Sequence, residues 1–116
     1  GLHRLLRESA RRFEADLNAH LLFNALDRGE PGVASLAIAE LAPALMGHAA
    51  TLERLFVELS VPATGAAAAL ALAGSADPAV LTRLERLARG AAESLATSRA
   101  LLALQMMEAA VVGDTR

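Results

Sequence analysis

Residues 22–63, LFNALDRGEPGVASLAIAELAPALMGHAATLERLFVELSVPA, decide the fold because they contain most of the helix breaks in the chain. Apolar residues at three- and four-residue spacing predict a helix that ends near Asp27 and another that follows the Gly-Glu-Pro-Gly turn at 29–32. A third helix is expected after a break at Gly47. Pro62 stops it, because proline lacks the amide donor and biases the preceding residue away from helical geometry. This stretch therefore predicts three helices joined by short turns.

Prolines and glycines also set the expected ends of these helices. Pro31 suits a first helical turn, and Pro43 should kink or shorten the last turn of the same helix. We expect Gly47 to end it in the left-handed conformation, with His48 in the following turn. The next helix, at about residues 50–60, should turn one set of side chains inward, Leu52, Leu55, Phe56 and Leu59, and another outward, Glu53, Arg54 and Glu58.

A long amphipathic helix is predicted at the start of the chain, over residues 2–27. Its apolar stripe recurs every three or four residues and consists of Leu2, Leu6, Ala10, Phe13 and Leu17. His20 continues this stripe. That position favours a half-buried structural histidine and leaves a functional histidine as the alternative.

A second long helix is predicted at the other end, opened by Asp77 as the N-cap residue and Pro78 at the first helical position. A seven-residue repeat runs through it, so we expect one straight helix of about 33 residues, or about 50 Å at 1.5 Å per residue. This length exceeds what the shorter helices can cover. Part of the helix should therefore meet a second copy or a partner domain, through Leu81, Leu84, Ala88, Leu95 and Leu102.

The composition supports an all-α fold. Of the 116 residues, 54% are hydrophobic and only 3% are aromatic, and Ala and Leu dominate the apolar part, which favours closely packed helices. We expect a single helical domain over residues 1–116, built as a bundle of four or five helices with a long C-terminal helix. The start at Gly1 in place of Met suggests a piece of a longer protein.

Charge and residue usage narrow the function classes. A net charge of −2 without a basic patch disfavours nucleic acid as a partner. The chain has no cysteine, so disulfides and thiolate metal sites are excluded. No apolar run reaches the roughly 18 residues that a membrane span needs, and no signal peptide opens the chain, so a cytoplasmic location is expected.

The central stretch resembles the helical cap of cobalamin-binding modules, found in corrinoid methyltransferase proteins and cobalamin-type light sensors. The matching pieces are Leu22 to Glu30, then Gly47 with the Leu-rich helix up to Leu59, then Pro62-Ala63. The resemblance implies a non-catalytic domain that packs over a ligand through Leu55, Phe56, Leu59, Ala67, Leu70 and Ala71. The family usually continues into a Gly and a Trp, whereas this chain reads TGAAAALALAG and has no Trp.

The end of the chain extends this comparison. In corrinoid proteins the cap is followed by a parallel-sheet domain, and Ala110 to Arg116, AVVGDTR, resembles the start of its first strand. Cobalamin could then bind only together with a second domain. The cofactor of this chain alone is therefore left unknown.

A shorter segment, Asn18 to Leu26 with the sequence NAHLLFNAL, resembles the Asn-Pro-His-Phe-Leu-Phe-Asn-x-Leu box of a family of bacterial sensor histidine kinases. This resemblance implies that His20 accepts phosphate on a dimeric helical hairpin. Ala19 replaces the proline of the box, and no Gly-rich nucleotide-binding stretch follows.

No catalytic constellation is visible in the sequence. There is no Gly-x-Ser-x-Gly elbow, and neither Glu-x-x-His nor His-x-x-x-His occurs, so neither an acyl-transfer site nor a metal site is predicted. We therefore expect a non-catalytic sensory or regulatory domain resembling a cobalamin-module cap. The alternatives are a histidine-phosphotransfer hairpin and a structural oligomerising bundle.

Overall fold

The structure, a computed structural model, describes residues 2–90 and 94–114. Within these residues it consists of six α-helices and one 3-10 turn, with no strand. The all-α prediction is thus confirmed, while the expected number of four or five helices was too low. The elements are α1 (Leu2–Asp27), α2 (Pro31–Leu41), η1 (Ala42–Leu45), α3 (Ala49–Glu58), α4 (Gly65–Ala73), α5 (Pro78–Ala88) and α6 (Leu95–Asp114).

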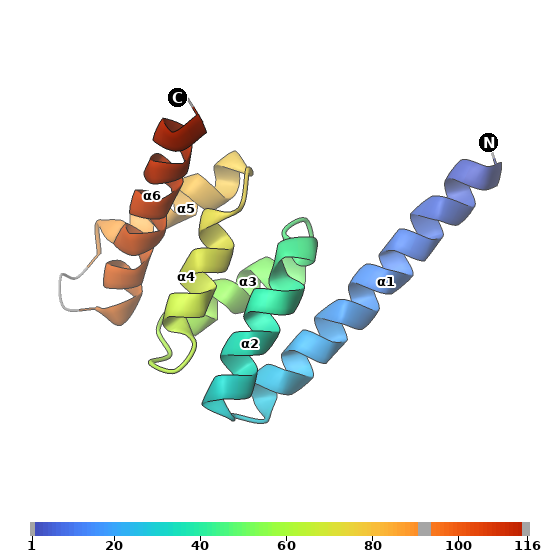
Figure 1. Cartoon of the computed structure of the whole chain (residues 1–116), viewed down its shortest axis with the longest axis horizontal. Coiled ribbons are helices and arrows are strands. Elements are labelled where there is room, and N and C mark those ends of the chain that lie inside the picture. Colours follow the sequence, from blue (N-terminus) through green and yellow to red (C-terminus); the bar gives the residue numbers. More distant parts are fainter. Residues whose placement is uncertain (1, 91–93, 115–116) are drawn as a thin grey trace.

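The helices form three consecutive hairpins, α1–α2, α3–α4 and α5–α6, whose members pack on each other. The second helices also contact one another, α2 with α4 and α4 with α6, and Figure 1 shows them following one another across the molecule with α3 and α5 behind. Stacked hairpins of this kind are the architecture of α-solenoids, in which each unit contacts only its neighbours.

Equivalent core positions recur along the stack. Leu22, Leu55 and Leu84 come from the first helices of the three hairpins, and each is fully buried. One helical turn later stand Leu26 in α1, Leu59 at the C-cap of α3 and Ala88 in α5, of which the two leucines are buried and the alanine is half-buried. Each first helix therefore contributes two core side chains at i and i+4, the spacing that places both on one face.

Long side chains connect the first helices, whose backbones do not pack closely. Arg54 of α3 reaches back to α1, where its guanidinium lies 2.8 Å from an Asp27 carboxylate oxygen and 6.0 Å from the centre of the Phe23 ring. Arg83 of α5 repeats this arrangement on α3: it pairs with Glu53 and lies 4.1 Å from the Phe56 ring centre. Each arginine thus combines an ion pair with a cation–π contact to the preceding hairpin.

These contacts shift the pKa values of the groups involved. Partial burial tends to lower the pKa of Arg54, but hydrogen bonds to Asp27 and Glu58 outweigh burial and raise it. The hydrogen bond from Arg83 lowers the pKa of Glu53. Both shifts favour the charged forms of Arg54 and Glu53.

Small residues let the second helices approach one another. The buried positions of α4 are Gly65, Ala68, Ala69 and Leu72, and α6 buries Ala100 and Ala103. Arg99 of α6 passes over Gly65 and donates a hydrogen bond of 3.2 Å to the carbonyl oxygen of Leu59, near the C-terminus of α3. A Cβ on Gly65 would stand 2.3 Å from the Arg99 guanidinium and 2.8 Å from that same carbonyl oxygen. Glycine at this position therefore allows α6 to cap α3.

Several predicted boundaries are confirmed by the structure. Pro31 opens α2 within its first turn, and α2 gives way to the 3-10 turn that contains Pro43. Asp77 caps α5 by accepting a hydrogen bond of 2.9 Å from the Ala79 amide. Gly47 does not adopt the left-handed conformation; the described glycine with positive φ is Gly29, at 72°, after α1.

The single long C-terminal helix was a wrong prediction. The chain ends α5 at Ala88, and α6 begins at Leu95 and packs back along α5. Close approach marks the turn, since a Cβ on Gly90 would stand 2.9 Å from the Thr97 hydroxyl. Folding back buries Leu84 and Ala100, which a straight helix would leave uncovered. The expected strand start over Ala110 to Arg116 is also wrong, because this stretch belongs to α6 as far as Asp114; residues 115 and 116 lie outside the described residues.

Two further expectations fail at the level of side chains. The apolar stripe of α1 faces outward, because α1 packs on α2 and η1 through the buried residues Ala19, Leu22 and Leu26. Glu58, expected to face solvent, is buried and accepts hydrogen bonds from Thr64 at 2.9 Å and Arg54 at 3.3 Å.

No helix among the described residues is both long and apolar enough to cross a membrane.

The close contact at Gly65 can be tested by Gly65→Ala. The new methyl group would meet a backbone oxygen that cannot move away, so we expect a loss of about 1–3 kcal/mol in the free energy of unfolding, as for other overpacked sites. Gly32→Ala is the matched control, because nothing lies within 4 Å of a Cβ there and alanine favours a helix. Urea unfolding followed by circular dichroism measures both. Equal stability of the two variants would contradict the packing described here.

Candidate functional site

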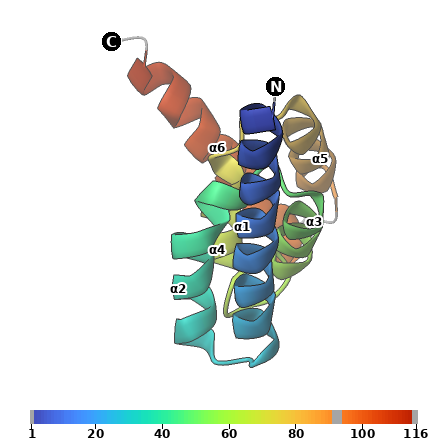
Figure 2. The same cartoon turned by 90° about the vertical axis from the view of Figure 1, so that its right-hand side faces the viewer.

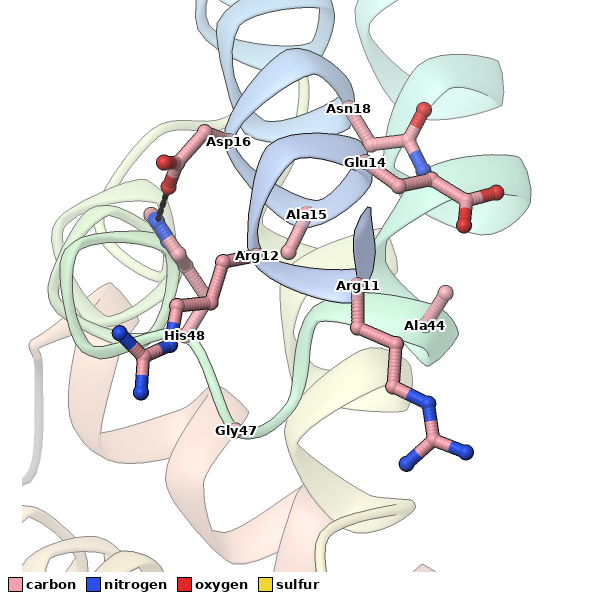
Figure 3. A pocket seen from close by; sticks show the side chains of 9 residues that line it. All are labelled: Arg11, Arg12, Glu14, Ala15, Asp16, Asn18, Ala44, Gly47 and His48. Atoms are coloured by element: carbon pink, nitrogen blue, oxygen red, sulfur yellow. Dashed lines mark ion pairs between the residues drawn. The ribbon is translucent and has the colours of Figure 1, made fainter. Parts of the chain in front are cut away.

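A broad polar groove of about 610 Å³ lies between the middle of α1 and the η1–α3 turn. Figure 3 shows its lining, in which Arg11 and Arg12 extend in different directions and Asp16 points to His48. The lining residues are Arg11, Arg12, Glu14, Ala15, Asp16, Asn18, Ala44, Gly47 and His48.

His48, at the edge of this groove, is the N-cap residue of α3. Its Nδ1 atom accepts a hydrogen bond of 3.2 Å from the Thr51 amide and lies 2.9 Å from the Thr51 hydroxyl. Because Nδ1 is an acceptor here, the neutral ring carries its proton on Nε2, which lies 3.4 Å from an Asp16 carboxylate oxygen. The Nδ1 atom therefore caps α3, and the Nε2 atom contacts Asp16 of α1, so the imidazole joins the two helices.

The lining of the polar groove combines two positive and two negative side chains with a histidine. Its two arginines are balanced by Glu14 and Asp16, and its histidine is fixed by the cap. Among the described residues, no three His, Asp or Glu side chains gather as metal ligands, and every buried polar side-chain atom has a hydrogen-bond partner. No unsatisfied group in these residues therefore points to a missing substrate or ion.

A smaller apolar groove of about 220 Å³ runs between the α2–η1 segment and α4. Its walls carry no charged side chain and consist of Ile38, Ala39, Pro43, Met46, Ala67, Leu70, Ala71 and Gly74. Pockets for whole small molecules commonly measure about 300–1,000 Å³, so this groove suits one or two apolar side chains better than a complete cofactor. Ala67 and Ala71 have small side chains, so the wall formed by α4 projects little into the groove.

Exposed leucines extend this apolar surface over the second helices. Leu36 on α2 and Leu70 on α4 are each 61% exposed, and Leu101 on α6 is 46% exposed. Because α1, α3 and α5 each cover one side of their hairpin partners, the exposed faces of α2, α4 and α6 lie on the opposite side. We name this surface, defined by Leu36, Leu70, Leu101 and the apolar groove, the second-helix face.

The structure divides the six residues predicted to face a ligand into two groups. Leu55, Phe56 and Leu59 are buried in the core, where their helix packs in the stack. Ala67, Leu70 and Ala71 line the apolar groove. The sequence prediction missed the opposite wall of this groove, Ile38, Ala39, Pro43 and Met46, whose nearest signal was the proline that ends α2.

Other predicted functional residues lie apart from this groove. His20 is exposed on α1, so the expectation of a half-buried structural histidine is wrong, and its role as a phosphoacceptor stays a prediction. Of the residues expected to contact a partner, Leu84 is fully buried and Ala88 is half-buried between α5 and its neighbours. Leu81, Leu95 and Leu102 are 36–40% exposed.

The chain was compared with protein-family models, curated proteins and solved structures, and none of them matches it. Its function is therefore inferred from its own residues and contacts.

The capping role of His48 can be tested with His48→Ala and His48→Asn. Alanine removes the acceptor for the Thr51 amide, and we expect it to cost about 0.5–2 kcal/mol of stability. Asparagine is itself a strong N-cap residue, so His48→Asn should retain most of the stability. Thermal unfolding of both variants gives the comparison. Equal losses in the two variants would show that the imidazole acts through Asp16 and not through the cap.

Proposed function

We propose that this chain is a non-catalytic regulatory domain that binds an amphipathic helix of a partner protein on its second-helix face. The observation that carries the proposal is the apolar groove between α2 and α4, with Leu70 exposed at its wall. The earlier expectation was a domain that packs over a ligand or a partner domain, and the groove favours the partner.

The shape of the groove supports a helix as the bound element. Amphipathic helices bind in apolar grooves by inserting side chains at i, i+3 or i+4 and i+7. A groove of about 220 Å³ has room for one or two such anchors, and the exposed leucines of α2 and α6 offer further apolar contacts on either side. The groove thus acts as the specific point of attachment within a wider apolar surface.

The lack of charge also favours an apolar partner. The whole of α4, GAAAALALA, contains no ionisable residue, so a partner side chain buried against it loses no ion pair and meets no unpaired charge. Patches of this kind on small proteins commonly mark sites of protein association. A partner helix with leucine or phenylalanine anchors fits this surface best.

The other functional hypotheses stay predictions. A corrinoid would need a broader flat surface and a second domain. The feature of the groove that favours a corrinoid is the wall formed by Ala67 and Ala71, whose small side chains such a ligand could approach. Phosphotransfer through His20 has in its favour that the imidazole is exposed. The absence of catalysis and the cytoplasmic location likewise remain proposals.

The proposal can be tested by selecting a displayed library of amphipathic helical peptides against the intact chain. We expect selected peptides to carry large apolar residues at i and i+4, and to lose at least about tenfold in affinity for Leu70→Glu, which places a charge at the groove. Val57→Glu is the matched control: Val57 is 59% exposed but lies on α3, outside the second-helix face. Isothermal titration with the selected peptides measures each affinity.

Other results of these binding measurements would contradict the proposal. Peptides that bind Leu70→Glu as well as the original chain, or that are lost on Val57→Glu instead, would place the binding site elsewhere. Absorbance titration with hydroxocobalamin separates the ligand hypothesis, since binding to the isolated chain that Leu70→Glu abolishes would assign the groove to a corrinoid.

A further inference from the structure

The outer side of α1 carries an apolar stripe that no other described element covers. Leu2 and Phe13 are 71% and 72% exposed, and Leu6 and Leu17 are exposed as well. Figure 2, which looks onto this side of the molecule, shows α1 in front of the other helices. We name this surface, defined by Leu2, Leu6, Phe13 and Leu17, the α1 stripe.

The α1 stripe is separate from the face of α1 that packs in the stack. Phe13 and Leu22 are nine residues apart, or two and a half turns at 3.6 residues per turn, so they point in opposite directions. The same spacing separates Leu17 from the buried Leu26. The helix therefore has one apolar face in the core and another in solvent.

The first half of α1 also lacks tertiary support. Every residue from Leu2 to Glu14 is exposed, and this part of the helix extends away from the other helices in Figure 1. A free helical segment of about this length is marginal in water, even when it continues a packed helix. The marginal stability of this segment and its exposed leucines both indicate that a partner covers the α1 stripe.

The order of residues in the α1 stripe points to a second copy of the same chain. Counted from the midpoint between Ser9 and Ala10, the stripe reads the same in both directions: large apolar residues stand at Leu6 and Phe13, and again at Leu2 and Leu17. An antiparallel copy centred there would place Leu6 against Phe13 and Leu2 against Leu17, in each case twice. The small Ser9 and Ala10 would meet at the crossing, where they allow the two backbones to approach.

Charges beside the stripe agree with the same arrangement. Arg7 and Glu14 lie on one flank of the stripe, and in the antiparallel pair Arg7 of one copy falls within about 3 Å, along the axis, of Glu14 of the other. The symmetry produces this opposite-charge contact twice. Antiparallel pairing thus brings together unlike charges as well as apolar side chains.

A lipid surface fits the stripe less well. Glu14 and Asp16 lie beside it and would face anionic headgroups, whereas Arg4 is nine residues from Phe13 and points away from the stripe. Arg4 is also paired within the helix, 3.6 Å from Glu8. Arg7 lies beside the stripe, but it shares that flank with Glu14, so the charges next to the stripe do not favour an anionic membrane.

We infer that two copies of this chain associate through the α1 stripe, with their first helices antiparallel and crossing at Ser9 and Ala10. This replaces the interface expected along one long C-terminal helix, which the structure does not contain. The interface lies on α1 and leaves the second-helix face free, so the dimer would present two such faces to partners. It does not depend on the binding proposed there.

Analytical ultracentrifugation over a range of concentrations tests the association. We expect the mass to rise from 12.0 kDa toward twice that value, and Phe13→Glu to raise the dissociation constant by about 30-fold or more, as for other central interface residues. Val57→Glu, with the same charge added at an exposed site on α3, should leave it unchanged. Circular dichroism shows whether each variant is folded. A chain that stays monomeric at millimolar concentration, or a dimer that Phe13→Glu leaves intact, would overturn the inference.

Cysteine cross-linking tests the orientation, because the chain has no native cysteine. In the antiparallel pair, Leu2→Cys and Leu17→Cys should form a disulfide when the two variants are mixed and neither should do so alone, since like positions lie about 22 Å apart along the axis. Cross-linking of either variant with itself would indicate parallel pairing and refute the proposed geometry. Binding to vesicles of equal parts phosphatidylglycerol and phosphatidylcholine without any dimer would assign the α1 stripe to a membrane surface instead.

Discussion

The close approach of neighbouring helices at α4 is the constraint on which the rest of the structure depends. Alanine and glycine on its buried face leave room for α6, and Gly65 leaves room for the Arg99 guanidinium to reach the end of α3. A larger side chain there would separate the second and third hairpins. α4 also contacts α2, and on that side two other small residues, Ala67 and Ala71, line the apolar groove beside Leu70.

The two sides of the stack are held together by different kinds of residue. The second helices pack directly, whereas the first helices are connected by Arg54 and Arg83, each of which combines an acidic partner with an aromatic ring from the preceding hairpin. Arginine suits this role because its planar charged group can stack and form hydrogen bonds at once. The chain has only three phenylalanines, and two of them are used in these contacts. The third, Phe13, lies in the α1 stripe.

Local rules predicted much of this fold. Proline and Asp77 located the starts of α2 and α5, and the Leu-x-x-Leu-Phe spacing identified the buried face of α3. The rules failed where a choice depended on tertiary packing. The seven-residue repeat continued across Gly90, so nothing in the periodicity indicated that α6 folds back on α5. On α1 the residues Leu2 to Leu17 formed the more obvious stripe, yet α1 packs in the core through Ala19, Leu22 and Leu26, and that stripe stays outside. The candidate site was half predicted for the same reason: the α4 wall follows from its Ala/Leu composition, but the opposite wall depends on how α2 ends.

The succession of hairpins has a consequence for how the chain folds. Most contacts join helices that are neighbours in sequence, so little loop-closure entropy has to be lost before each contact forms. Topologies of this kind fold quickly, and in stacked repeats folding can begin in any unit and spread to the next. The α5–α6 and α3–α4 hairpins, joined by the α4–α6 contact, would then order first. The free half of α1, which has no neighbour in the stack, would be the last part of the molecule to acquire a fixed structure.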